Sequence, residues 1–302
     1  MRLIFAGTPA IAAQALEELS RHHEIVLAIT REDAPVGRKR VITPSAVAQS
    51  AERLGIKTLK TSRVTDHLEE IAGANAELAV VVAYGALVPQ SALEIMPWWN
   101  LHYSLLPAWR GATPLQHSMI FDSGIGITIF ELEKGLDTGP VIRSVPMEFL
   151  PQEIASEALI RFTTKGTELL LETLKTKPDP KSQQGEPSLA PKISRAEAKI
   201  DFNQPADRIE RMIHALNPEP TAWTNFAGQP LKLLRARSLG AVDWEALDSL
   251  GSPGVMWQDE NRVLIGCGGG TRLEIIELQP AGKKPMTALE FIRGQQGRVT
   301  LD

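Results

Sequence analysis

Continuous apolar runs separated by segments of helical spacing constrain the first half of this chain more than any other feature. The runs are RLIFAG at the start, EIVLAIT at 24–30 and ELAVVVAYG at 77–85. After the first run, PAIAAQALEELS has apolar residues at the spacing of an amphipathic helix, and a further helix is predicted over 44–54. Strands that are apolar on both faces and alternate with helices are typical of a parallel sheet. The pattern therefore predicts an α/β domain with a mostly parallel sheet.

The rest of this half predicts an extension of that sheet. A short helix is expected over 91–95 and a strand over 99–103, followed by a loop that contains prolines. The next strand, GIGITIFELE, contains glycines and is followed closely by VIRSVPMEF, which predicts antiparallel pairing. The strongly amphipathic segment SEALIRFTTKGTELLLETLK then predicts a closing helix.

A boundary between domains is expected at KTKPDPKSQQGEPSLAP, because its prolines, lysines and small polar residues are typical of an exposed linker. The length of 302 residues also favours two domains, at roughly 150 residues each. We predict a first domain over 1–178, a linker over 179–198 and a second domain over 199–302. In the second, one helix precedes short strands that alternate with glycine and proline turns, which predicts a small β barrel.

The composition excludes several classes of protein. With 43% hydrophobic and 23% charged residues, the chain is typical of a globular protein. No secretory signal or membrane span is indicated, so a cytoplasmic protein without a membrane partner is expected. The single cysteine, Cys267, excludes an intramolecular disulfide and a cysteine-rich zinc site, and we expect it to be buried or in a turn. The net charge of -4 argues against binding nucleic acid through bulk positive charge but allows a local basic patch.

Two further kinds of site are not favoured. The first strand ends in Gly-Thr-Pro and lacks the G-x-G-x-x-G fingerprint, which argues against a nucleotide-dependent oxidoreductase. The histidines outside the central segment show no metal-ligand spacing, either among themselves or with carboxylates. We therefore expect no metal. These histidines are His22, His23, His67, His117 and His214.

The segment NLHYSLLPAWRGATPLQ, at 100–116, is the most informative for chemistry. If the strand over 99–103 forms, Asn100 and His102 project from the same face, because side chains alternate along a strand. A lone histidine in a strand is more often structural than catalytic. Here a carboxamide lies two residues away, and a loop follows where the carboxyl end of a strand opens into a crevice, which favours function.

A second candidate is GLDTG, in which Asp137 lies between glycines that allow a tight turn. Alone, such an aspartate most often caps its own turn, so only the company of Asn100 and His102 favours catalysis. The three side chains match the needs of amide transfer. Asn100 can donate to an oxyanion, His102 can move a proton, and Asp137 can orient the ring and favour its charged form.

These residues belong to a chain that resembles the bacterial methionyl-tRNA formyltransferases over nearly its whole length. The matching segments are FAGTP, APVGRKRVITPS, VVVAYG, N-x-H, SLLPAWRGATPLQ, GLDTG, ALNPEPTAW and LQPAGKKPM. The resemblance implies a doubly wound formyltransferase domain joined to an OB-like barrel. It also implies 10-formyltetrahydrofolate as formyl donor and methionine on the initiator tRNA as acceptor, for translation initiation.

The resemblance also implies roles for particular residues. It makes Asn100, His102 and Asp137 the catalytic trio. Ser104, Leu105, Leu106 and Pro107 are expected to contact the folate, and Arg38, Lys39 and Arg40, in the loop over 34–41, to contact the tRNA acceptor stem. Exposed arginine and lysine beside a glycine can grip phosphates, although a solvated charge run is the plain alternative.

Alternatives within the same fold remain at this point. A formyltransferase acting on a sugar amine and a formyltetrahydrofolate hydrolase share the catalytic domain, whereas GLDTG, the basic loop and PAGKKPM favour tRNA. A tRNA-binding module without catalysis is disfavoured by the intact trio. Tyr103 stands where the family usually has glycine or alanine, but alternation directs it away from the trio. We expect a monomer, and discrimination against elongator tRNA is left open.

Overall fold

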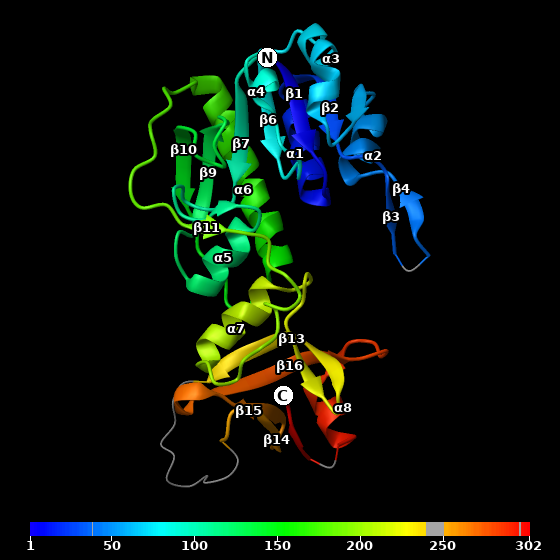
Figure 1. Ribbon diagram of the computed structural model, residues 1–302, viewed down its shortest axis with the longest axis vertical. Helices are drawn as coiled ribbons and strands as arrows, with labels where there is room; N and C mark the ends of the chain where they lie inside the picture. The colour runs from blue at the N-terminus through cyan, green and yellow to red at the C-terminus, as the bar shows by residue number, and fades with distance from the viewer. Residues whose placement is uncertain (38, 240–250, 296) are drawn as a thin grey trace. The chain divides into compact units, whose positions relative to one another are not determined.

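The computed structural model of the protein describes residues 1–37, 39–239, 251–295 and 297–302 (Figure 1). The chain folds into two compact units. The first comprises Met1–Pro114, Gly124–Glu148 and Leu159–Pro191, and the second comprises Leu115–Ser123, Phe149–Ala158 and Lys192–Asp302.

The first unit is built on a seven-stranded sheet with the order β10-β9-β7-β6-β1-β2-β5. Its strands are β1 (Arg2–Gly7), β2 (Glu24–Thr30), β5 (Thr58–Lys60), β6 (Leu78–Val82), β7 (Trp98–His102), β9 (Gly126–Glu131) and β10 (Val141–Pro146). The five strands from β5 to β7 are parallel, and β9 runs antiparallel to both β7 and β10. All five residues of β6 are buried, as expected for a strand covered on both sides.

Helices cover both faces of this sheet. They are α1 (Ala10–Ser20), α2 (Ala46–Arg53), α3 (Leu68–Gly73), α4 (Gln90–Leu93) and α6 (Ala155–Thr176), with a 3₁₀ turn η1 at Val64–His67. On one face, Ile71 of α3 and Ala92 of α4 share a buried cluster with Ile4 of β1. On the other face, α6 packs its Gly166 against Leu101 of β7. The doubly wound architecture and the antiparallel extension by β9 and β10 are therefore confirmed.

Two short ladders flank the main sheet. One is a hairpin of β3 (Ala34–Val36) and β4 (Val41–Thr43), at the positions expected to form a basic loop (Figure 1). The other joins β8 (Arg110–Gly111) in parallel to β11 (Leu189–Ala190).

We call residues 181–191, which include β11, the strap. The strap is tied to the first unit, because Lys181 and Val141 exchange two backbone hydrogen bonds of 2.7 Å. At β8, Gly111 has φ 130, and a Cβ added there would lie 2.6 Å from the carbonyl oxygen of Ala190. Only glycine fits this approach of the strap to β8.

The second unit contains an antiparallel, barrel-like sheet with the order β12-β13-β16-β15-β14-β18, and β17 pairs with β16. Its elements are α5 (Pro114–Phe121), α7 (Ala206–Ala215), β12 (Trp223–Phe226), β13 (Gln229–Leu239), β14 (Val255–Asp259), β15 (Arg262–Gly266), η2 (Gly268–Gly270), β16 (Arg272–Pro280), β17 (Met286–Thr287), α8 (Ala288–Arg293) and β18 (Arg298–Thr300). Ile209 and Ile213 of α7 join the same core as Leu233 and Ile275 of the sheet. Cys267 is buried in this core, as expected. Among the described residues, no helix combines the length and apolar character needed to cross a membrane.

Candidate active site

Strand β7 carries two of the predicted catalytic side chains. Asn100 pairs with Val81 of β6 and with Phe130 of β9, while His102 pairs with Thr128 of β9. Because side chains alternate along a strand, Asn100 and His102 lie on one face. Tyr103, the next residue, makes a 2.8 Å hydrogen bond with the hydroxyl of Thr163 in α6, which lies on the opposite face of the sheet. Its side chain is thus directed away from the candidate site.

The His102 ring is buried, with 4% of its surface exposed, and both ring nitrogens have neighbours. Its Nε2 lies 3.0 Å from the carbonyl oxygen of Trp109. Because a carbonyl oxygen only accepts, Nε2 must donate, and in the neutral ring the lone pair then belongs to Nδ1. This Nδ1 lies 3.8 Å from Oδ2 of Asp137. The free lone pair of His102 therefore faces a carboxylate.

The pKa of His102 is lowered. Its main cause is desolvation, because burial disfavours the charged ring; the carboxylate of Asp137 and the carbonyl of Trp109 oppose the shift. The ring is consequently neutral near pH 7 and can accept a proton at Nδ1. A proton accepted there would rest beside the carboxylate of Asp137.

Asp137 is brought to this position by the turn that also contains Gly135 and Gly139. Its backbone is left-handed, with φ 49, a conformation that aspartate tolerates better than most residues. A Cβ at Gly139 would lie 1.8 Å from the carbonyl oxygen of Glu131, so the turn closes against β9 only with glycine there. The Oδ2 atom of Asp137 accepts a 2.7 Å hydrogen bond from the backbone N–H of Gly111. A charge-assisted bond of this kind orients the carboxylate.

A further residue at this turn was not singled out by the sequence patterns. Gln183 of the strap donates from Nε2 to the carbonyl oxygens of Asp137 and Gly139, both at 2.8 Å. No local pattern in the sequence signals this contact, because it joins segments far apart in the chain.

The expected folate-contacting segment, Ser104 to Pro107, continues directly from β7. Ser104 is fully buried, and its hydroxyl donates to the carbonyl oxygen of Ala108 at 2.6 Å. The hydroxyl of Thr128 donates to the carbonyl of Ser104 at 2.7 Å and accepts from the N–H of Leu106 at 3.1 Å. The segment is thus fastened to β9. Leu105, Leu106 and Pro107 are half-buried.

The expected tRNA contacts lie apart from the trio, on the connection between β3 and β4. Lys39 and Arg40 are exposed there, and neither forms an ion pair with a residue that the structure describes. Arg38 lies outside the described residues.

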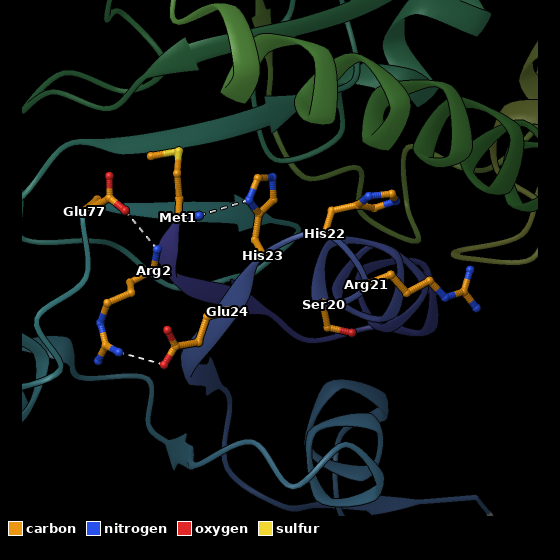
Figure 2. Close-up of a pocket in the computed structure, with 8 residues that line it drawn as sticks. All are labelled: Met1, Arg2, Ser20, Arg21, His22, His23, Glu24 and Glu77. Carbon is orange, nitrogen blue, oxygen red and sulfur yellow. Dashed lines mark hydrogen bonds and ion pairs between the residues drawn. The ribbon is translucent and has the colours of Figure 1, made fainter.

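Other clusters of polar residues do not resemble a reaction centre. A surface hollow of about 510 Å³ lies at the amino-terminal ends of β1 and β2, with Met1, Arg2, His23, Glu24 and Glu77 among its lining residues (Figure 2). Figure 2 shows that its charges are largely paired: Arg2 binds Glu24 at 2.7 Å and donates its backbone N–H to Glu77 at 3.0 Å. Within the described parts of the chain, no three His, Cys, Asp or Glu side chains are grouped so as to hold a metal ion.

Comparison with known families gives two matches that together cover most of the chain. A family model described as "Formyl transferase" matches residues 1–174, and one described as "Formyl transferase, C-terminal domain" matches residues 192–296.

Individual proteins give the same picture. The methionyl-tRNA formyltransferase of Leifsonia xyli subsp. xyli is 39% identical over 309 residues, covering 100% of both chains. That of Renibacterium salmoninarum is 43% identical and covers 97% of this chain and 96% of the relative. Among solved structures, HypX from Aquifex aeolicus in complex with tetrahydrofolic acid has a TM-score of 0.61 at 16% identity. The match covers 97% of this chain and 47% of HypX, and it shows a shared fold.

Proposed function

Because this chain belongs to the methionyl-tRNA formyltransferase family, we propose that it transfers the formyl group of 10-formyltetrahydrofolate to the α-amino group of methionine on the initiator tRNA. This reaction prepares the tRNA for translation initiation. The observation that carries the proposal is the buried, neutral His102, whose free Nδ1 lies 3.8 Å from Asp137. Asn100 lies on the same face of β7.

The chemistry needs a proton acceptor, a stabilised oxyanion and a proton donor. As the amine nitrogen bonds to the formyl carbon, His102 accepts the amine proton at Nδ1. Asp137 then stabilises the imidazolium, while the side-chain N–H of Asn100 donates to the developing oxyanion. When the bond between the formyl carbon and the folate nitrogen breaks, the imidazolium returns its proton to the departing nitrogen. The ring ends neutral, and one amide bond has replaced another.

The donor is proposed to contact Ser104, Leu105, Leu106 and Pro107. The Ser104 hydroxyl already donates to Ala108, so the half-buried apolar side chains and the backbone of the segment are the groups proposed to face the folate. The attachment of Leu106 to Thr128 fixes this segment beside the end of β7, where His102 lies. No metal has a role in this mechanism.

Binding of the tRNA is assigned to two regions. Lys39 and Arg40 are exposed cations that can contact phosphates, and Arg38 is proposed to act with them. The second region is the carboxyl-terminal domain, proposed to extend over 199–302 after a catalytic domain over 1–178 and a linker over 179–198. We propose a cytoplasmic monomer, since charged initiator tRNA is used in that compartment.

The two alternatives, a sugar-amine formyltransferase and a formyltetrahydrofolate hydrolase, are not favoured by the relatives at 39% and 43% identity. One assay separates the three activities. The purified protein is incubated with 10-formyltetrahydrofolate and either methionyl initiator tRNA, a nucleotide-linked amino sugar, or buffer alone. Formylmethionine released from the tRNA supports the proposal, while formyl sugar, or formate without acceptor, would replace it. Uncharged initiator tRNA is the control.

A further inference from the structure

The side-chain amide of Gln183 uses all of its hydrogen-bonding capacity in one place. Its Nε2 donates to the carbonyl oxygens of Asp137 and Gly139, both at 2.8 Å. Its Oε1 accepts from Nε and Nη2 of Arg110, at 3.2 and 2.7 Å. An amide offers two N–H donors and two acceptor lone pairs, and here all four have partners. Neither a carboxylate nor an ammonium can replace it, because the first lacks donors and the second lacks acceptors.

These four bonds hold both sides of the Asp137 carboxylate contact. Asp137 has a left-handed backbone, a conformation that costs about 1 kcal/mol or more and persists only where its surroundings fix it. Its Oδ2 accepts from the N–H of Gly111, and Arg110, the residue before Gly111, is bound to the same Gln183. Gln183 therefore joins the acceptor turn to the donor strand β8.

The strap is itself anchored to both partners of His102. On one side of Gln183, Lys181 pairs with Val141, just beyond the turn of Asp137. On the other side, the hydroxyl of Ser188 accepts from the N–H of Trp109 at 2.9 Å. The carbonyl of Trp109 in turn accepts from Nε2 of His102. Gln183 thus lies between two backbone anchors and has little freedom to move.

We propose that Gln183 is a positioning residue for the formyl-transfer reaction, fixing the carboxylate of Asp137 beside Nδ1 of His102. This inference depends on the proposed catalytic role of Asp137. Gln183 acts on geometry alone and transfers no proton.

The test compares Gln183→Met with Gln184→Met in the full-length protein. Gln184 is an exposed neighbour whose Nε2 makes a long bond of 3.4 Å to the carbonyl of Ser182, so it is a matched control. Gln183→Met is expected to lower kcat by about 10- to 100-fold, with a smaller change in KM, because displacements near 1 Å have such effects in active sites. Gln184→Met should match the parent protein.

A spectroscopic readout separates positioning from general stability. The pKa of His102, followed by NMR of its imidazole, should fall further in Gln183→Met, because Asp137 raises that pKa only while it is held nearby. Gln184→Met should leave the titration unchanged. A titration of His102 that is identical in Gln183→Met and the parent would overturn the proposal.

Gln183→Glu keeps the acceptor for Arg110 and removes both donors, so it remains decisive even if Gln183→Met does not fold. Its kcat should fall as far as that of Gln183→Met, with Gln184→Glu as the charge-matched control. Parent-like turnover of Gln183→Glu would overturn the proposal, since the hydrogen bonds to Asp137 and Gly139 would then be dispensable.

A double-mutant cycle with Asp137→Asn distinguishes this inference from the function on which it rests. If Gln183 acts through Asp137, adding Gln183→Met to Asp137→Asn should lower kcat much less than it does in the parent. Equal losses in the two backgrounds would overturn the positioning role alone. Parent-like turnover of Asp137→Asn by itself would contradict both the proposed function and the inference.

Discussion

Nδ1 of His102 and Oδ2 of Asp137 lie 3.8 Å apart, beyond hydrogen-bond length but within reach of an ion pair. In the neutral state the two atoms are both acceptors, so no proton lies between them. Protonation of Nδ1 would convert this contact into an attraction between opposite charges in a buried site. The arrangement therefore favours His102 as a base that is neutral before the reaction and stabilised after it has accepted a proton.

Removal of either member of this pair should nearly abolish formyl transfer. We expect His102→Ala and Asp137→Ala each to lower kcat by about 10²- to 10⁴-fold, the usual contribution of general acid–base catalysis. The double variant should be little worse than either single one, because the two residues act as a unit. Single-turnover formylation of methionyl initiator tRNA measures the effect. His22→Ala, at an exposed histidine of the same unit, is the control, and near-normal rates in both active-site variants would refute the assignment.

Asn100→Asp tests the oxyanion donor while keeping the size of the side chain. The carboxylate cannot donate, so kcat should fall by about 10²- to 10³-fold, as for the loss of an oxyanion donor elsewhere. The KM for the tRNA should change little, because the bond forms with charge that develops during the reaction. Steady-state kinetics at saturating folate provide both constants. A rise in KM with kcat retained would assign Asn100 to ground-state binding instead.

Titration of His102 should begin below pH 6.5, the ordinary value for histidine, because desolvation lowers its pKa. The folded state then binds fewer protons than the unfolded state, in which the ring has its ordinary pKa. The stability from neutral, buried His102 is therefore present above pH 6.5 and is lost as pH falls toward the folded pKa. Urea unfolding between pH 8 and pH 5 should show this fall, with a shallower slope for His102→Gln. An equal slope in that variant would contradict the lowered pKa.

The basic connection between β3 and β4 should act by neutralising phosphates. Replacing Arg38, Lys39 and Arg40 by glutamine should raise the KM for tRNA without lowering kcat. It should also flatten the dependence of log affinity on log salt by about 0.9 for each phosphate left without its cation, if the site resembles duplex DNA, or less for other geometries. Filter binding at several salt concentrations measures the slope. Lys165→Gln on α6 serves as the control. An unchanged slope would leave these residues as a solvated charge run.

The regular part of the fold follows from local patterns. The apolar runs predicted β1, β2 and β6, and the alternation in the segment after them predicted β7, with Asn100 and His102 in one strand. Strand β5 was not predicted, because it has three residues, of which Leu59 alone is buried, and so short a run has no readable period.

The interactions that fix the candidate site are less accessible to sequence reasoning. The carbonyl of Trp109 binds His102 through the backbone, which leaves no trace in residue type. Gln183 reaches Asp137 across 46 residues of sequence, from a stretch whose composition is typical of an exposed linker. Glycine turns and strand alternation identify which side chains carry the chemistry, whereas the groups that orient them depend on tertiary pairing.

The strap has a practical consequence for dissecting the protein. A fragment that ends at residue 178, where proline and lysine suggest a natural cut, would retain His102 and Asp137 but lack Gln183, Ser188 and the partner of β8. Such a fragment would keep its reacting groups without their scaffold. An autonomous catalytic fragment should therefore extend to Pro191, and exchange of carboxyl-terminal domains between relatives should join the chains after that residue.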